Sequence, residues 1–417
     1  MSDIAIKAEL RRARGKFAAM AAAYSLGVFN DNFFKQAAML LAVAAGLRHV
    51  QGWATMLFTL PFIVAAAPAG WLADRFPKRT VVIGAKAMEL GAMALGAAGM
   101  VLLSWPLVLA MVCTMGLQSA IFGPALNGSI PELYPPAYVT RANGILRVFV
   151  TGAILLGVAL AGLALEGKAL LAGVPAGRWT VAAACLAVAT GGLASSFAVP
   201  RRPAAAPGLP FPWDGPVRTL RTLAFACRDG QLAAAIGADL FVWTAGALQI
   251  MVINVLGSAQ LGCGEAATSG LVAAELVGIA AGGLAAGWLA RGARWHRVLA
   301  PAAAGMGAAM LGVRLAVAAP AAQRYGWVLA ALLAAGAFGG LLMIPCEAFI
   351  QLRPPARRRG AVIAASNFVI FAGIFVSGPL ANAMNEHLAP ATSFAIMGAS
   401  SLGFALVLRA VLRKVAS

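Results

Sequence analysis

The chain alternates long apolar segments with short polar ones. The first six apolar segments lie near residues 17–47, 52–73, 80–103, 106–122, 142–165 and 178–199. The second six lie near residues 231–256, 266–290, 298–319, 325–349, 361–384 and 392–412. Segments of roughly 20 apolar residues can cross the hydrocarbon core of a bilayer as helices. The pattern predicts an all-α transmembrane protein, a bundle of twelve helices in two six-helix halves.

A polar segment and a repeat divide the predicted bundle. Residues 200–229 contain six prolines, five arginines and no apolar run long enough to span. We therefore predict an N-terminal half over 1–199, a cytoplasmic linker over 200–229 and a C-terminal half over 230–417. The tetrapeptide Gly-Trp-Leu-Ala ends the second span at residue 73 and the eighth span at residue 290, and a basic loop follows each copy. An internal repeat of this kind supports two equivalent halves.

Composition and charge placement fit a membrane protein with both termini in the cytoplasm. Hydrophobic residues make up 61% of the 417 residues and charged residues 11%, against roughly a quarter charged in soluble domains. The net charge of +18 comes from basic clusters between spans, which argues against a nucleic-acid partner. Termini placed inside put 24 of the 32 basic residues on the cytoplasmic side, and basic residues favour that side. The basic N-terminus lacks the short apolar segment and small-residue cleavage site of a signal peptide.

The sequence contains no pattern typical of an enzyme or a metal site. The five cysteines are scattered and odd in number, which favours neither a disulfide framework nor metal binding. Glycine-rich phosphate loops, dinucleotide fingerprints and nucleophile elbows are absent. No histidine is followed at five residues by the aspartate of an acyltransferase motif. We expect no catalytic residues, no cofactor and no metal.

The loop after the second span carries a recognisable motif. Gly70, Leu72, Ala73, Asp74, Arg75 and Arg79 resemble the signature loop of the major facilitator superfamily. A carboxylate can cap the positive N-terminus of another helix, and arginines can pair with acids or carbonyls. We predict a conformational gate formed by Gly70, Asp74, Arg75 and Arg79, with the start of the eleventh span near Gly360 as its partner. A basic loop that only fixes topology is the alternative.

Further motifs are similar to those of the bacterial lysophospholipid transporter family. They are the run 29–35 in span 1, the segment Gly116-Leu117-Gln118-Ser119, the Ala142-Asn143-Gly144 opening of span 5, and Gly339-Gly340 with Pro345, Gln351 and Asn367. The resemblance implies a major-facilitator-type bundle that transports lipid, and members of the family sometimes occur fused to an acyltransferase. The chain departs from the family pattern in having Asn127 in span 4 and Arg147 in span 5.

Polar residues inside spans are the candidates for substrate binding, because charges there cost roughly 2.5–3.5 kcal/mol each on insertion scales. Asp31 lies 15 residues beyond Lys16, roughly 22 Å along a helix and so near mid-membrane. Lys35 shares its face, and the two could instead neutralise each other. Lys86 with Glu89, and Glu275 with Arg314, are further possible structural pairs. The predicted binding set is Asn30, Asp31, Asn32, Lys35, Gln118, Asn127, Arg147, Asp239, Trp243, Glu347, Gln351 and Asn367.

These observations lead to one functional hypothesis with two alternatives. We expect a flippase that moves lysophospholipid from the outer to the cytoplasmic leaflet of the bacterial inner membrane by alternating access. Arg147 could bind the lipid phosphate, and Asp239 with Trp243 could bind an ammonium head. The alternatives are a proton-coupled exporter of drugs or metabolites, and a membrane docking subunit for a lipid acyltransferase. Expected partners are lysophospholipid, membrane lipid and a cytoplasmic acyltransferase.

Overall fold

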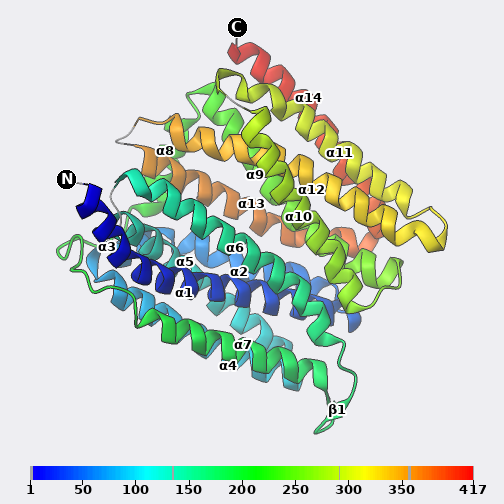
Figure 1. The fold of residues 1–417 in the computed structure, drawn as a ribbon. Helices are drawn as coiled ribbons and strands as arrows, with labels where there is room; N and C mark the ends of the chain where they lie inside the picture. Colours follow the sequence, from blue (N-terminus) through cyan, green and yellow to red (C-terminus); the bar gives the residue numbers. More distant parts are fainter. Residues whose placement is uncertain (1–2, 134–135, 291, 356–357, 417) are drawn as a thin grey trace. The chain divides into compact units, whose positions relative to one another are not determined.

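The computed structural model describes residues 3–133, 136–290, 292–355 and 358–416. Side chains are not described for residues 3–14, 126–133, 136–144, 147, 292–294 and 414–416. The described part is almost entirely helical (Figure 1). Its strands, β1 (Leu170–Leu171) and β2 (Val174–Pro175), pair antiparallel in a short hairpin between two helices.

The chain forms two compact units. Unit 1 comprises Met1–Ala38 and Leu57–Trp213, and unit 2 comprises Met39–Met56 and Asp214–Ser417. The predicted halves follow the internal repeat of the sequence. The compact units are divided differently from these halves in two places. Met39–Met56, from the first two spans, belong to unit 2, and the linker divides between Trp213 and Asp214.

Most helices of unit 1 follow the predicted spans. Its elements are α1 (Asp3–Ala44), α2 (His49–Val64), α3 (Ala66–Arg75), α4 (Lys78–Leu102), α5 (Trp105–Leu133), α6 (Pro136–Leu165) and α7 (Ala176–Ser196), although the end of α1 and the start of α2 lie in unit 2. Helix α4 packs against both α5 and α7. An apolar core that includes Phe17, Met20, Val82 and Phe122 joins α1, α4 and α5.

Unit 2 holds the second set of spans and one helix that the sequence pattern did not predict. Its elements are α8 (Gly215–Ala226), α9 (Gly230–Val255), the π-helix η1 (Leu256–Gln260), α10 (Glu265–Leu289), the 3-10 helix η2 (Gly292–Val298), α11 (Leu299–Ala316), α12 (Ala321–Leu352), α13 (Arg359–His387) and α14 (Pro390–Ala416). Helix α8 lies within the predicted linker and packs on α13.

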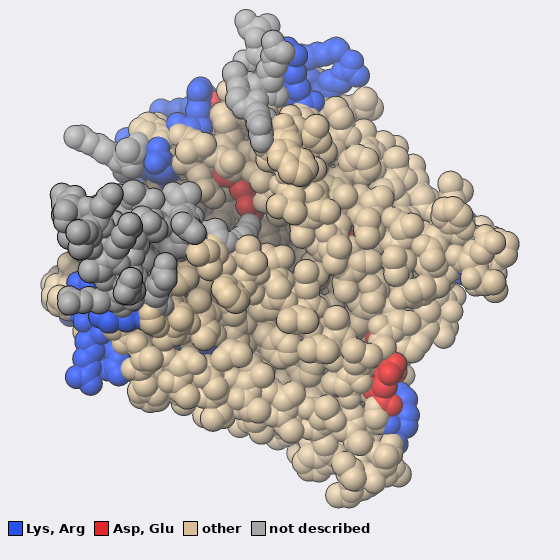
Figure 2. Space-filling model, in the orientation of Figure 1, with Lys and Arg blue, Asp and Glu red and all other residues tan. Residues whose placement is uncertain are grey.

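Ten of the described helices are long and apolar enough to cross a membrane, and α2 with α3 add one more if the bent pair is a single span. Helix α1 is 42 residues long, but Asn30, Asp31, Asn32, Lys35 and Gln36 interrupt its apolar sequence. Counting α1 gives the twelve predicted spans. Most of the face seen in Figure 2 is uncharged, and Lys and Arg gather near its margins.

The second span is broken near Ala65. Helices α2 and α3 meet at an angle of 53°. Pro68, in the first turn of α3, has no N–H to donate to the Val64 carbonyl, so the helical ladder fails there. The ladder resumes with Ala69, whose N–H donates to Ala65 at 2.8 Å. The break sets the direction of the short helix that carries the gate motif.

Glycines let α10 and α12 approach closely. A side chain added at Gly282 would collide with the backbone of Ala337, and one added at Gly340 would collide with the backbone of Ile279. Small residues allow this close packing between membrane helices. The Gly339-Gly340 motif therefore has a packing role in unit 2, at least at Gly340.

Candidate functional site

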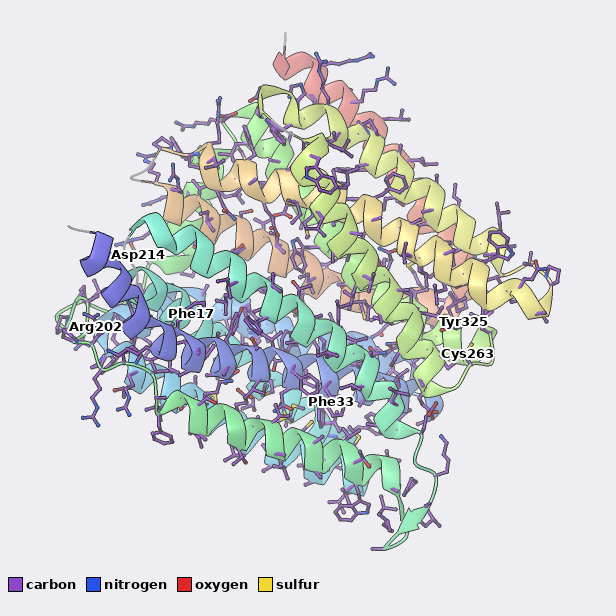
Figure 3. All side chains as sticks on the ribbon, in the orientation of Figure 1. Phe17, Phe33, Arg202, Asp214, Cys263 and Tyr325 are labelled. Carbon is purple, nitrogen blue, oxygen red and sulfur yellow. The ribbon has the colours of Figure 1, made fainter. Side chains whose placement is uncertain are left out.

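The polar cluster on α1 consists of Asn30, Asp31, Asn32, Lys35 and Gln36. Asp31 precedes Phe33 by two residues in the sequence, and Phe33 is labelled in Figure 3 together with Phe17 of the same helix. Asp31 as a whole is half-buried, although Oδ1 is a buried atom, and Oδ2 accepts a hydrogen bond of 2.9 Å from the Ser119 hydroxyl of α5. Oδ1 has no hydrogen-bond partner among the described residues. One carboxylate oxygen of Asp31 thus accepts a hydrogen bond, and the other accepts none from the described residues.

Lys35 lies one turn beyond Asp31, but the described contacts include no ion pair between them. The Lys35 ammonium lies 4.7 Å from the centre of the Phe58 ring, close enough for a cation–π contact. Asp31 and Lys35 therefore attract each other electrostatically without forming a close ion pair among the described contacts. A carboxylate and an ammonium remain near each other on one face of the same helix, each with capacity for a further polar group.

A chain of polar side chains continues from Asp31 into the core of unit 1. The Ser119 hydroxyl is also 3.0 Å from Gln118 Oε1, and one hydroxyl proton can serve only one of these two acceptors at a time. Gln118 Nε2 donates to Glu89 Oε2 at 3.3 Å, and Lys86 Nζ donates to the same oxygen at 2.6 Å. The Lys86–Glu89 pair suggested by sequence is confirmed.

Burying the Lys86–Glu89 pair costs desolvation free energy and requires a specific arrangement of the side chains around it. Its side chains are 1% and 0% exposed, and Lys86 Nζ also lies 4.9 Å from the Phe122 ring centre. Burying two charges requires good mutual geometry and further hydrogen bonds; Gln118 supplies one to Glu89 Oε2, while Oε1 has no partner among the described residues. Gln118 was predicted to bind substrate; it is 3% exposed and links the buried pair to Ser119 and Asp31.

The asparagines beside Asp31 point to different surroundings. Asn30 is fully buried, and its amide donates to the Cys185 carbonyl of α7 at 3.0 Å. The Asn32 amide donates to the Val28 carbonyl of its own helix at 2.8 Å. Asn30 therefore joins α1 to α7, and only Asn32 is half-exposed on the same stretch as Asp31. The backbones of Asn127 and Arg147 lie in α5 and α6, but both side chains lie outside the described residues.

Unit 2 brings together three of its predicted site residues. Asp239 of α9 is buried, and its carboxylate interacts with the indole N–H of Trp243, one turn along the helix. Glu347 of α12 is near enough to repel Asp239 electrostatically. Asp239 Oδ1 has no hydrogen-bond partner among the described residues. Gln351 and Asn367, predicted in the same set, are exposed on α12 and α13.

Glu275 and Arg314 do not form the pair that the sequence allowed. Glu275 is buried on α10, and its Oε2 has no hydrogen-bond partner in the described part of the chain. Arg314 is exposed in the last turn of α11. Helical spacing can locate partners on one helix, whereas a pair between helices depends on how the helices rotate as they pack.

The gate motif is engaged by the first part of the linker. Trp71 Nε1 and an Arg75 guanidinium nitrogen both donate to the Leu209 carbonyl, at 2.9 and 2.6 Å. The Ala206 N–H donates to the Asp74 carbonyl at 2.8 Å. The Phe211 ring packs edge-on against Trp71, with ring centres 5.2 Å apart. We call residues 206–213 the linker strap.

The remaining gate residues have different surroundings. An Arg79 guanidinium nitrogen donates to the Phe197 carbonyl at the end of α7, at 2.8 Å. The Asp74 side chain is exposed, and Gly70 is half-buried on α3. The predicted contact with the start of the eleventh span stays a prediction. The strap contacts could not be foreseen, because they join segments more than 130 residues apart.

Sequence reasoning missed two further residues at the candidate site. Ser119 was quoted only as part of a motif, and its role as a donor to Asp31 depends on the packing of α5 against α1. Phe58, under the Lys35 ammonium, carried no polar signal at all. No group of three or more His, Cys, Asp or Glu side chains that could hold a metal occurs within the described ranges.

Comparison with known proteins matches the chain to a family and to particular relatives. A family model described as the Major Facilitator Superfamily matches residues 17–378. A lysophospholipid transporter of Cronobacter sakazakii is 29% identical over 356 residues, which cover 82% of this chain and 81% of that protein. A lysophospholipid transporter of Serratia proteamaculans is 28% identical over 351 residues, covering 80% and 79%. The resemblance inferred from the motifs is confirmed.

Solved transporter structures share the fold at low sequence identity. The nucleoside transporter NupG superposes with a TM-score of 0.73 at 10% identity, covering 95% of this chain and 99% of that one. A D-xylose–proton symporter superposes with a TM-score of 0.69 at 15% identity, covering 97% of each chain. The predicted fold class is confirmed.

Proposed function

The chain belongs to the major facilitator superfamily, and from this premise we propose that it moves lysophospholipid across the bacterial inner membrane. The direction is from the outer to the cytoplasmic leaflet, and the mechanism is alternating access. Relatives described as lysophospholipid transporters, similar over about four fifths of the chain, support this choice of substrate. The acyl chain needs no polar site, so only the headgroup must be received by polar side chains.

The observation that carries the proposal is the set of contacts that Asp31 and Lys35 make. One carboxylate oxygen accepts from Ser119, the other is not hydrogen-bonded within the described part, and Lys35 attracts Asp31 without a close ion pair among the described contacts. A zwitterionic headgroup presents an ammonium and a phosphate, which match a carboxylate and an ammonium that are close but separate. Charges held in this way inside a span are costly, which is expected where a ligand supplies the missing partners.

Further residues fit the same assignment. Arg147 on α6 would bind phosphate, since a guanidinium can contact two phosphate oxygens. Asp239 and Trp243 in unit 2 would receive an ammonium group through charge and cation–π attraction. Asn32, Asn127, Glu347, Gln351 and Asn367 would contact the headgroup during its passage, whereas buried Asn30 and Gln118 would position α1 and Ser119.

Asp31→Asn tests the proposal. The amide oxygen can still accept the Ser119 hydrogen bond, so the variant should fold normally while losing the charge. We expect uptake of labelled lysophosphatidylethanolamine by spheroplasts to be abolished. Ser119→Ala is the matched control, because it removes the hydrogen bond and keeps the charge; its uptake should fall only in part. Wild-type uptake by Asp31→Asn would assign the cluster to structure.

A panel of labelled compounds tests the substrate class. The proposal expects competition by lysophospholipids and none by hydrophobic drugs or small metabolites. Drug efflux that depends on a proton gradient would favour the exporter. Normal membrane attachment of an acyltransferase, with no lipid movement by the purified protein in vesicles, would favour the docking subunit.

A further inference from the structure

Helix α8 exposes an apolar stripe to its surroundings. The helix runs from Gly215 to Ala226, starting directly after Asp214, which is labelled in Figure 3. Val217 and Leu220 are 48% and 56% exposed, and Ala224 is also exposed. These three residues are three or four positions apart, so they lie on one face of the helix.

The opposite side of α8 packs against the protein. Gly215 and Ala226 are buried, and Ala226 belongs to the apolar core of unit 2, with Leu223 packed against that core. This face contacts α13. A helix at a water-facing surface normally points its large apolar residues inward and its polar residues outward. Helix α8 packs Leu223 and Phe225 inward and in addition leaves Val217 and Leu220 exposed on the other side, which is favourable beside another apolar phase.

The place of α8 in the chain puts it at a membrane boundary. Three residues separate its end at Ala226 from Gly230, where α9 begins, and α9 is apolar and long enough to cross the bilayer. Asp229 caps the start of α9 by accepting from the backbone N–H of Gln231 and Leu232. Because the basic residues place the linker on the cytoplasmic side, α8 adjoins the cytoplasmic leaflet.

The charges of α8 favour an anionic lipid surface. Arg218 and Arg221 are exposed along one edge of the stripe. Asp214 forms an ion pair with Arg218, with nitrogen and oxygen 2.6 Å apart, whereas the helix itself contains no acidic residue. A helix with an apolar face flanked by arginines binds in the plane of the interface and gains affinity from anionic lipid.

We propose that α8 lies in the cytoplasmic interface of the membrane, with Val217, Leu220 and Ala224 at the acyl boundary and Arg221 on anionic lipid phosphates. Such an anchor would hold the second part of the linker to the membrane surface while the spans move. The proposal does not depend on which substrate the protein carries, so it can fail or hold independently of the function proposed above.

Two exposed alanines give a matched test. An environment-sensitive fluorophore is attached to Ala224→Cys or to Ala205→Cys in full-length protein whose exposed Cys227 has been replaced by serine. The protein is placed in nanodiscs of phosphatidylcholine, with or without an equal share of phosphatidylglycerol. We expect lipids spin-labelled in the acyl chain to quench most of the emission at position 224 and little at position 205. Arg221→Gln should remove the extra quenching that phosphatidylglycerol produces.

Two outcomes would overturn the proposal. Strong quenching at position 224 by aqueous iodide, with none by spin-labelled lipid, would show that the stripe faces water and is open to a soluble partner. Equal lipid quenching at both positions would show that contact with lipid is not specific to α8.

Discussion

The two units place their ion pairs at different depths. In unit 1, Lys86 and Glu89 pair inside the core and are joined by hydrogen bonds to the residues around Asp31. In unit 2, Asp229 and Arg353 pair at 30% and 50% exposure. Both units also hold buried carboxylate oxygens without a hydrogen-bond partner among the described residues, on Asp31 and Glu89 in unit 1 and on Asp239 and Glu275 in unit 2. Among the described residues, unit 1 thus holds a buried ion pair, whereas the ion pairs Asp214–Arg218 and Asp229–Arg353 of unit 2 lie at the surface.

The repeated tetrapeptide shows the same contrast at the ends of two equivalent spans. Trp71 donates to the linker strap and packs against Phe211. Trp288, at the same place in the second copy, is 72% exposed. Equal sequence at equivalent positions therefore does not give equal contacts, because only the first copy has the linker beside it. In unit 1 the linker strap accepts hydrogen bonds from the gate motif.

The strongest test of the comparison removes one buried charge from unit 1. Lys86→Met should destabilise the protein by about 3–5 kcal/mol, because Glu89 would stay buried without its cation. Glu275→Gln in unit 2 should change stability by less than about 1 kcal/mol, since no described partner is lost. Reversible unfolding in mixed micelles measures both.

A double variant provides the control for the buried pair. Lys86→Met with Glu89→Leu should recover most of the lost stability, because replacement of both charges leaves neither uncompensated. If the double variant is as unstable as Lys86→Met alone, packing around Lys86 and not its charge is what matters. Equal losses from Lys86→Met and Glu275→Gln would remove the contrast between the units.

The next test concerns substrate binding by unit 1. If Arg147 holds the lipid phosphate, Arg147→Ala should weaken lysophospholipid binding by about 1.5–3 kcal/mol, as for a hydrogen bond to a charged group. Arg147→Lys should recover only part, because an ammonium lacks the planar two-pronged contact. Thermal unfolding in detergent, with and without lipid, measures the effect. Lipid-induced stabilisation that persists unchanged in Arg147→Ala would exclude the phosphate role.

The spans and local pairs were predictable from sequence because they depend on short-range order. Apolar length located the helices, and a three-residue spacing located Lys86 beside Glu89. The same spacing left two possibilities open for Asp31 and Lys35, and in the structure Asp31 accepts from Ser119 while Lys35 lies over Phe58. Spacing on one helix shows which contacts are possible, and tertiary packing decides which of them form.

Contacts between distant segments carried no local signal. Helix α8 was missed because its twelve residues are too short for a span and lie in a proline-rich segment. The strap joins Trp71 and Arg75 to Leu209 through a backbone carbonyl, which any residue possesses. The break between α2 and α3 had a visible cause in Pro68, but sequence alone did not give its angle.

The contact between Trp71 and the strap can be tested against Trp288, the equivalent residue of the repeated tetrapeptide. Trp71→Phe keeps an aromatic ring beside Phe211 and removes the N–H donor to Leu209, which should cost about 0.5–1.5 kcal/mol. Since the strap stabilises one arrangement of the gate, we expect substrate turnover to fall and substrate affinity to stay near wild type. Trp288→Phe is the matched control and should change neither. Spin-label distances across the gate should shift only in Trp71→Phe.

Asp74→Asn and Arg79→Ala address the other gate residues. If the gate stabilises a conformation without touching substrate, both variants should leave substrate binding detectable and lower turnover. A collapse of affinity with an unchanged distribution of spin-label distances would contradict this role.

The smallest effect is expected at the exposed pair of unit 2. Partial burial alone would raise the pKa of Asp229, but the hydrogen bonds from Arg353 and from the Leu232 and Gln231 N–H groups outweigh burial and lower that pKa. A carboxyl with a lowered folded-state pKa stabilises the protein above its unfolded pKa of about 3.9, and the contribution disappears as pH falls through the lower folded value.

Arg353→Ala should therefore cost about 0.2–1 kcal/mol at neutral pH, the range for solvent-exposed pairs, and less in acid, as Asp229 loses its charge. Unfolding in mixed micelles at several pH values measures this difference. Arg218→Ala is the matched control: it removes an arginine whose ion pair lies within one helix segment, whereas Arg353 joins the end of α12 to the start of α9.

If the two variants lose the same stability at every pH, the Asp229–Arg353 pair adds nothing beyond a local surface contact. A loss as large as that of Lys86→Met would show that exposure does not separate the ion pairs of the two units.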